Sequence, residues 1–119
     1  MKEQNRPFIT PECERLFKEY CNLTTKTEIE NRLIEAQNKA LKSHPYRCIQ
    51  EFRFSEPRIW KHPFYSKLLE AKESLGDKTF LDIGCCTGTD LRSLVIDKLF
   101  KPKVFKYSFI FYLFQLIKI

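Results

Sequence analysis

Hydrophobic residues recur at helical spacing through the first 75 positions of the chain. A threonine–proline pair at residues 10–11 indicates the start of a first helix, with the hydroxyl as cap and the proline in the first turn. A capping box at residues 25–28 starts a second helix, which should end before Pro45 because the residue before a proline avoids the helical region. A third helix is expected from about residue 63 to 75, closed by Gly76. The apolar faces expected to point inward are Leu16, Phe17, Tyr20 and Cys21, then Ile29, Leu33, Ala36, Ala40 and Leu41, and finally Leu68, Leu69 and Leu75.

The pattern changes at residues 80–92, where a short apolar run leads into a glycine-containing loop and a further helix. The run at 80–83 is nearly continuous, which is typical of a parallel strand covered on both faces. Asp82 interrupts it near the strand's end. Gly84 and Gly88 would let the backbone turn sharply and approach a ligand closely. The residue that caps the following helix is expected to be Thr87, Thr89 or Asp90.

The charges around this loop indicate what it would bind. A phosphate-binding loop offers a lysine and free amide groups, whereas no lysine follows Gly88 here and Asp82 and Asp90 flank the loop. Two unit charges about 4 Å apart near a protein surface interact by ~4 kcal/mol, so the two acids would oppose a phosphate. They would favour a ligand with a cationic end, such as S-adenosylmethionine, which carries a sulfonium and an ammonium group.

Residues 82–88, Asp-Ile-Gly-Cys-Cys-Thr-Gly, resemble the first motif of the class I methyltransferases that use S-adenosylmethionine, with Cys86 in place of the usual middle glycine. Three blocks in order, at residues 46–54, 62–65 and 81–94, are similar to a fungal subfamily of secondary-metabolite methyltransferases that includes enzymes of meroterpenoid pathways. The resemblance covers about residues 10 to 97. It implies an α/β chain, the amino-terminal part of a Rossmann-like methyltransferase fold with a helical amino-terminal cap.

The same resemblance assigns roles to residues of the loop. Asp82 would accept a hydrogen bond from the methionine ammonium of S-adenosylmethionine, and the glycines and cysteines would give close backbone contact. In the segment before the motif, Arg53 would reach the methionine carboxylate or the adenine, or would simply be a surface arginine. The expected cofactor-binding residues are Asp82, Gly84, Cys85, Cys86, Thr87, Gly88, Asp90 and Arg53. The acceptor would be a carboxyl or hydroxyl group of a small polyketide or terpenoid metabolite, and no catalytic base is identifiable.

Charge divides the 119-residue chain unevenly. Residues 1–97 hold 16 Lys+Arg against 15 Asp+Glu, whereas the residues from Lys98 onward add five lysines and no acid to give the net charge of +6. We therefore expect a helical cap at 1–62, the start of the cofactor-binding domain at 63–99, and a basic, aromatic tail at 100–119 that is functional or unrelated to the parent fold. Enzymes of the family are longer, so the resemblance implies an amino-terminal portion of an enzyme, without the second strand and with an incomplete active site. A catalytically inactive remnant is the alternative expectation.

Other function classes are less consistent with these residues. The five cysteines form no C-x-x-C pair and no metal-ligand spacing with either histidine, which favours free thiols in a reducing, cytoplasmic setting without a bound metal. Cys86 and Arg92 have the C-x5-R spacing of cysteine phosphatases, but Asp82 and Asp90 oppose a phosphate there. The near-neutral residues 1–97 argue against nucleic acid. Residues 104–119 are too few to span a bilayer unaided, which leaves surface contact with a membrane or a β-prone strand pair as alternatives for the tail.

Overall fold

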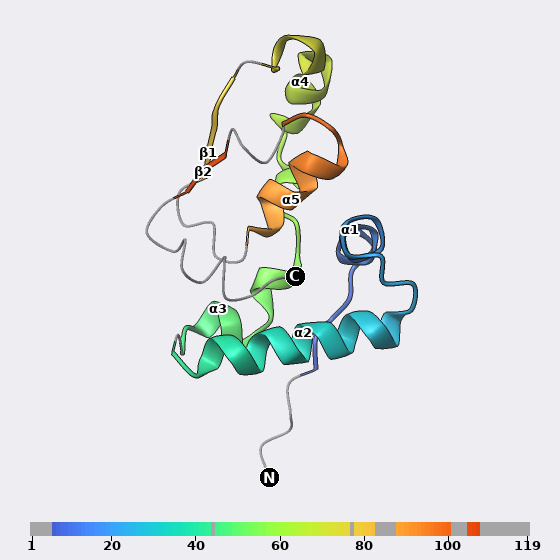
Figure 1. Ribbon diagram of the computed structural model, residues 1–119, viewed down its shortest axis with the longest axis vertical. Coiled ribbons are helices and arrows are strands. Elements are labelled where there is room, and N and C mark those ends of the chain that lie inside the picture. Colours follow the sequence, from blue (N-terminus) through green and yellow to red (C-terminus); the bar gives the residue numbers. More distant parts are fainter. Residues whose placement is uncertain (1–5, 44, 77, 83–87, 101–104, 108–119) are drawn as a thin grey trace.

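The computed structural model describes residues 6–43, 45–76, 78–82, 88–100 and 105–107, and the statements below refer to these residues. Most of them are helical, and the remainder include a pair of short strands (Figure 1). In chain order the elements are α1 (Pro11–Cys21), α2 (Lys26–Leu41), α3 (Arg47–Gln50), the 3₁₀ turns η1 (Arg53–Ser55) and η2 (Ile59–Lys61), α4 (Tyr65–Glu70), the 3₁₀ turn η3 (Lys72–Ser74), β1 (Phe80–Asp82), α5 (Thr89–Ile96) and β2 (Phe105–Tyr107).

The first two helices begin where the sequence predicts. The Thr10 hydroxyl accepts a hydrogen bond from the backbone N–H of Cys13 at 3.1 Å, and Pro11 occupies the first turn of α1. At the start of α2, the Thr25 hydroxyl accepts from the N–H of Glu28 and the Glu28 carboxylate accepts from the N–H of Thr25, both at 3.2 Å. This is the predicted capping box, and α2 ends at Leu41, before the proline.

Helices α1, α2 and α3 enclose the larger of two hydrophobic clusters. The inward positions of α2 agree with the predicted stripe, but in α1 Cys13 is buried while Tyr20, predicted to point inward, is 38% exposed. Phe52 is buried with a left-handed φ of 57°, a conformation that a bulky side chain adopts only when its surroundings hold it. The fully or nearly buried members are Cys13, Leu16, Phe17, Ile29, Leu33, Ala36, Ala40, Ile49, Phe52 and Phe54.

The third predicted helix is shorter than expected. Helix α4 ends at Glu70, and a 3₁₀ turn, η3, replaces its predicted last turn. Leu69, predicted to point inward, is 45% exposed, whereas Leu68 and Leu75 are partly buried against the second cluster. Gly76 is exposed and does not have the positive φ of a helix-ending glycine. The prediction fails here because contacts from other segments, and not the local apolar spacing, decide which leucines are covered.

Strands β1 and β2 are parallel and are connected through α5. Phe80 pairs with Phe105, Leu81 with Lys106 and Asp82 with Tyr107, so three residues of the predicted tail belong to the sheet. The sequence left a strand pair in this tail as one alternative, but it did not predict the parallel pairing with β1. Leu81 is 59% exposed, so the expectation of a strand covered on both faces is wrong for the described part of β1. The second hydrophobic cluster lies beside this unit and contains Tyr65, Leu91, Leu94, Leu99 and Phe100.

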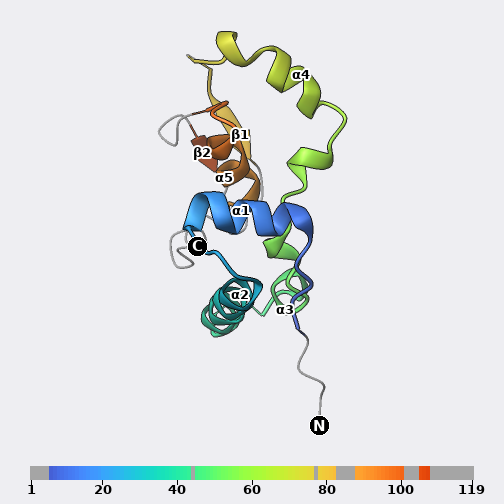
Figure 2. The ribbon, with the colours of Figure 1, turned by 90° about the vertical axis from the view of Figure 1, so that its right-hand side faces the viewer.

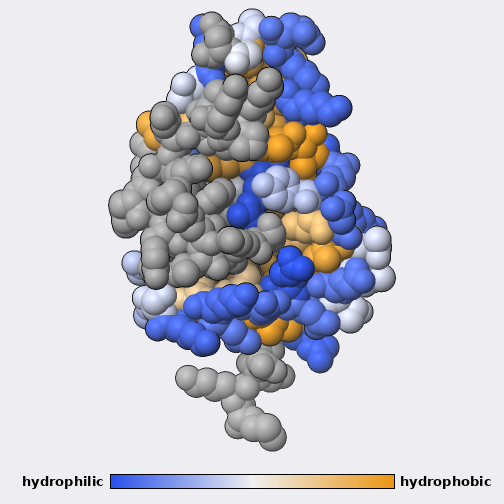
Figure 3. All heavy atoms as spheres, in the orientation of Figure 1, coloured by the Kyte–Doolittle hydropathy of each residue, from blue (hydrophilic) through white to orange (hydrophobic). Residues whose placement is uncertain are grey.

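The two clusters lie toward opposite ends of the molecule. Figure 2 shows α2 and α3 at one end, α4 and β1 toward the other, and α1 against α5 between them. Trp60 packs against both clusters. In Figure 3 hydrophilic residues cover most of the α2 end, and hydrophobic residues are exposed nearer the α4 end. Within the described residues, no helix has the length and the apolar character required to cross a bilayer.

Candidate functional site

An open pocket of about 220 Å³ lies where β1 ends, between the first turn of α5 and the cap segment around η2. Its lining combines hydrophobic residues with two acids, an arginine and a histidine. The residues that line it are Arg58, Ile59, His62, Phe80, Leu81, Asp82 and Asp90. The pocket therefore combines two of the predicted loop residues with three residues of the cap that the sequence analysis did not assign to the site.

Asp82 is the least satisfied acid of this pocket. It lies at the end of β1 and is partly buried, and its carboxylate accepts no hydrogen bond from any other described residue. Burial, and then the negative charge of Asp90, raise the pKa of Asp82 to about 6. A carboxylate in this setting lacks a donor or a cation, which a ligand could supply.

Asp90 has a different role because its carboxylate is already engaged. Its Oδ1 atom accepts hydrogen bonds from the backbone N–H groups of Arg58 at 2.8 Å and Ile59 at 3.0 Å. Asp90 therefore fixes the cap segment to the first turn of α5. It still lines the pocket and contributes its negative charge beside Asp82.

The start of α5 differs from the prediction that a side chain would cap it. Gly88 is the N-cap residue with a left-handed φ of 74°, and no side chain caps the helix. Thr89 donates its hydroxyl hydrogen to the backbone carbonyl of Phe54, and Asp90 accepts from the cap segment as described. Thr87 lies outside the described residues. The left-handed φ explains the need for glycine at position 88.

The cap side of the pocket carries two side chains that suit an anion. Arg58 and His62 are both exposed and line the pocket. No carboxylate of the described residues lies within ion-pair distance of the Arg58 guanidinium. The Nδ1 atom of His62 accepts a hydrogen bond from the backbone N–H of Phe64 at 3.1 Å, so its Nε2 atom carries the ring hydrogen.

The remaining predicted cofactor residues are only partly described. Arg53 lies on η1 outside the pocket lining, and its Nε atom is 2.7 Å from Oε2 of Glu51. Gly88 is buried at the start of α5. Gly84, Cys85, Cys86 and Thr87 lie outside the described residues, so their assignment to the cofactor stays a prediction. Of the described candidates, the pocket brings together Asp82 and Asp90.

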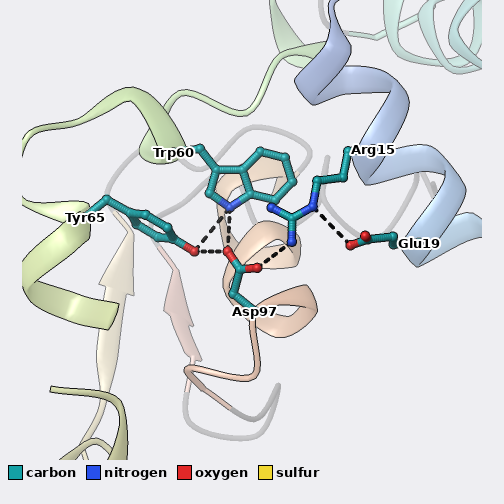
Figure 4. Close-up of polar contacts among 5 residues, drawn as sticks. All are labelled: Arg15, Glu19, Trp60, Tyr65 and Asp97. Carbon is teal, nitrogen blue, oxygen red and sulfur yellow. Dashed lines mark hydrogen bonds and ion pairs between the residues drawn. The ribbon is translucent and has the colours of Figure 1, made fainter. Parts of the chain in front are cut away.

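A second polar cluster, not foreseen from the sequence, joins α1, η2, α4 and the end of α5 (Figure 4). The Oδ2 atom of Asp97 accepts from Trp60 Nε1 at 2.9 Å and from the Tyr65 hydroxyl. Its Oδ1 atom accepts from Arg15 at 2.6 Å, and the Arg15 guanidinium lies 4.4 Å from the centre of the Trp60 ring. Burial opposes the charge of Asp97, but the hydrogen bonds from Tyr65 and Arg15 outweigh it and lower its pKa. The partners are far apart in sequence, so no local pattern indicates the cluster.

Comparison with known proteins identifies a family match in the amino-terminal half of the chain and several similar proteins. Residues 2–55 match the family model of the meroterpenoid methyltransferase N-terminal domain. The chain is 47% identical over 58 residues to the O-methyltransferase phiE of a fungal species, an alignment that covers 49% of this chain and 19% of that protein. It is 33% identical over 94 residues to the methyltransferase ausD of Aspergillus calidoustus, covering 79% of this chain and 33% of that protein.

A further relative has a name that states its substrates. The asnovolin E/chermesin D methyltransferase nvfJ of Aspergillus novofumigatus is 33% identical over 82 residues, 69% of this chain and 28% of that protein. The alignments thus span about a fifth to a third of the length of these relatives. No solved structure matches the chain. Residues 2–55 therefore match the amino-terminal domain of the meroterpenoid methyltransferases, and these homologues support a fungal meroterpenoid-type methyltransferase.

Proposed function

We propose that this chain provides the helical cap and the first part of an S-adenosylmethionine-binding site of Rossmann-like architecture, for methyl transfer to a small secondary metabolite. The parallel β1–α5–β2 unit supports the architecture, since a strand, a crossover helix and a parallel strand form the repeating unit of such folds. In these folds ligands bind beyond the carboxyl ends of the strands. The pocket is at that end of β1.

One observation carries the choice of ligand. Asp82 is a partly buried acid without a hydrogen-bond donor among the described residues, and its pKa is raised to about 6 by burial and by Asp90. A cation in the pocket would offset both the burial of the Asp82 carboxylate and its repulsion by Asp90. A phosphate would instead add a third negative charge. The ammonium and sulfonium groups of S-adenosylmethionine satisfy the first condition.

The residues present fit the methyl donor in kind. Asp82 would accept from its ammonium group, while Phe80, Leu81 and Ile59 offer apolar surface in the same pocket. When bound, S-adenosylmethionine supplies an activated methyl group that is transferred by in-line displacement. This chain's contribution to that reaction would be to bind and orient the donor. The description of the matching family, meroterpenoid methyltransferases, suggests a terpenoid-type metabolite as acceptor here.

Isothermal titration calorimetry of the 119-residue chain with S-adenosylmethionine tests the proposal. We expect measurable binding at pH 7.5 that is about 10- to 100-fold weaker in Asp82→Asn, because a charge-assisted hydrogen bond to the ligand is lost. Glu73→Gln is the matched control, since Glu73 is an exposed acid outside the pocket lining. It should leave the affinity unchanged.

Two results would refute the proposal. The first is the absence of heat at millimolar S-adenosylmethionine, which would indicate a chain that has lost the site. The second is tighter binding of ATP than of S-adenosylmethionine, which would mean that the acids do not determine the ligand.

A further inference from the structure

We propose that Arg58 and His62 form a donor wall of the pocket that binds the carboxylate of the methyl donor's amino-acid end, opposite an acidic wall formed by Asp82 and Asp90. The inference rests on the proposed function and adds to it the recognition of a zwitterion. Its ligand class is an α-amino acid group, which carries an ammonium and a carboxylate on one carbon atom. A site for such a group needs both charges within a single pocket.

The structure fixes the donor wall to the acidic wall. The Asp90 carboxylate accepts from the backbone N–H of Arg58 at 2.8 Å and of Ile59 at 3.0 Å, so the segment that carries the donor wall is tied to the first turn of α5. Both walls line the same pocket of about 220 Å³. The backbone that carries the donor wall is therefore held beside Asp90 by hydrogen bonds.

Arg58 is available for a ligand, unlike the arginines of the cap that are paired with carboxylates. Arg47 and Arg53 are paired with Glu51 at 2.6 and 2.7 Å, and Arg15 is paired with Asp97 at 2.6 Å. Arg58 lacks a carboxylate partner among the described residues, although Asp82 and Asp90 line the same pocket. A guanidinium in that position can hold a carboxylate through two parallel hydrogen bonds.

The ring of His62 is oriented as a donor. Because Nδ1 accepts from the N–H of Phe64 at 3.1 Å, the hydrogen is on Nε2. That nitrogen can donate to a carboxylate oxygen but has no lone pair with which to remove a proton from an acceptor. His62 is therefore assigned to binding and not to base catalysis.

The test compares S-adenosylmethionine with decarboxylated S-adenosylmethionine by calorimetry on the complete chain. The second compound retains the sulfonium and the amine and lacks only the carboxylate. We expect the wild-type chain to prefer S-adenosylmethionine by about 10- to 100-fold, the range of one or two charge-assisted hydrogen bonds. Arg58→Gln should lose most of that preference and keep its affinity for the decarboxylated compound. Arg47→Gln, an exposed arginine outside the pocket lining, should retain the preference.

Two variants of His62 separate its ring nitrogens. In His62→Gln the side-chain amide replaces the Nε2 donor, whereas in His62→Asn the amide oxygen replaces the Nδ1 acceptor and the donor is lost. The preference for S-adenosylmethionine should persist in His62→Gln and weaken in His62→Asn.

The outcomes distinguish the two proposals. Equal or tighter binding of the decarboxylated compound by the wild-type chain overturns the donor wall and leaves the proposed function intact. If Arg58→Gln keeps the wild-type preference for S-adenosylmethionine, the donor wall is likewise overturned and the proposed function is left intact. If neither compound binds, the proposed function fails and the donor wall fails with it.

Discussion

At the scale of single residues, Asp82 is the position where stability and binding are expected to conflict. The carboxylate lies partly buried beside Asp90 and its pKa is raised to about 6 from an ordinary 3.8. The folded chain therefore holds this proton more firmly than the unfolded chain does. Above about pH 6 Asp82 is ionised, and the free energy of unfolding is lowered by the full amount. This loss disappears as the pH falls toward 4.

Asp82→Asn should consequently stabilise the fold at neutral pH while weakening the methyl donor's binding. A shift of this size corresponds to roughly 1–3 kcal/mol once solvent screening at an open pocket is allowed for. Urea unfolding at pH 7.5 should show the gain, and at pH 4 the two proteins should differ little. A variant that is less stable than the wild type at pH 7.5 would contradict the electrostatic description of the pocket.

The same carboxyl group predicts how binding of S-adenosylmethionine depends on pH. Affinity should be constant above about pH 7 and fall below pH 6, approaching a factor of about ten per pH unit, because a proton on Asp82 competes with the cation. Asp90, Arg58 and His62 also face the pocket, so calorimetry on His62→Gln is the control for histidine titration. The decrease should persist in that variant and vanish in Asp82→Asn. A decrease that vanishes in His62→Gln but persists in Asp82→Asn would contradict the assignment to Asp82.

At the scale of elements, the helix starts test how well local chemistry determines structure. The Thr25 hydroxyl satisfies the N–H of Glu28 at 3.2 Å, and its removal leaves that donor to water. Thr25→Ala should therefore cost about 1 kcal/mol of unfolding free energy. Thr27→Ala, also exposed in the first turn of α2, is the matched control and should cost less, because alanine is the better helix former. Urea unfolding followed by circular dichroism measures both, and equal losses would contradict the cap.

Elements whose signals are local could be predicted from the sequence. The caps of α1 and α2 lie within four residues of the groups they satisfy, and β1 is an apolar run that ends at an acid. The start of α5 could not be predicted in detail, because Thr89 donates to Phe54 and Asp90 accepts from Arg58, 35 and 32 residues away. The pairing of β2 with β1 could not be predicted either, because it joins segments that are distant in sequence.

The candidate site shows the same division. Asp82 and Asp90 were found because acids beside a glycine-containing loop are unusual for a phosphate site. The sequence analysis did not place Arg58 and His62 at this pocket, because the hydrogen bonds that bring the cap to the first turn of α5 join distant segments. Arg53 was preferred on sequence grounds, yet it pairs with Glu51 outside the pocket lining. A pattern of charges along the sequence can therefore suggest the class of ligand. The residues of opposite charge in the same pocket become known only from the fold.

At the scale of the whole molecule, α5 is fastened to the cap along its length. Its first residues form hydrogen bonds with the backbone of Phe54 and of the Arg58–Ile59 segment. Its C-cap residue Asp97 accepts hydrogen bonds from Arg15 and Trp60. Trp60 also packs against both hydrophobic clusters. Helix α5 and the cap should therefore unfold together and not as separate units.

Asp97→Ala tests this coupling, since it removes the acceptor shared by Arg15, Trp60 and Tyr65. Loss of a partly buried charged acceptor should cost about 2–4 kcal/mol, and the circular dichroism and Trp60 fluorescence transitions should separate. Because the pKa of Asp97 is lowered, its contribution is complete above about pH 4 and fades below it. Glu19→Ala, which removes only the exposed partner of Arg15, should change stability far less. Coincident transitions with an unchanged midpoint in Asp97→Ala would show that apolar packing alone joins the two halves.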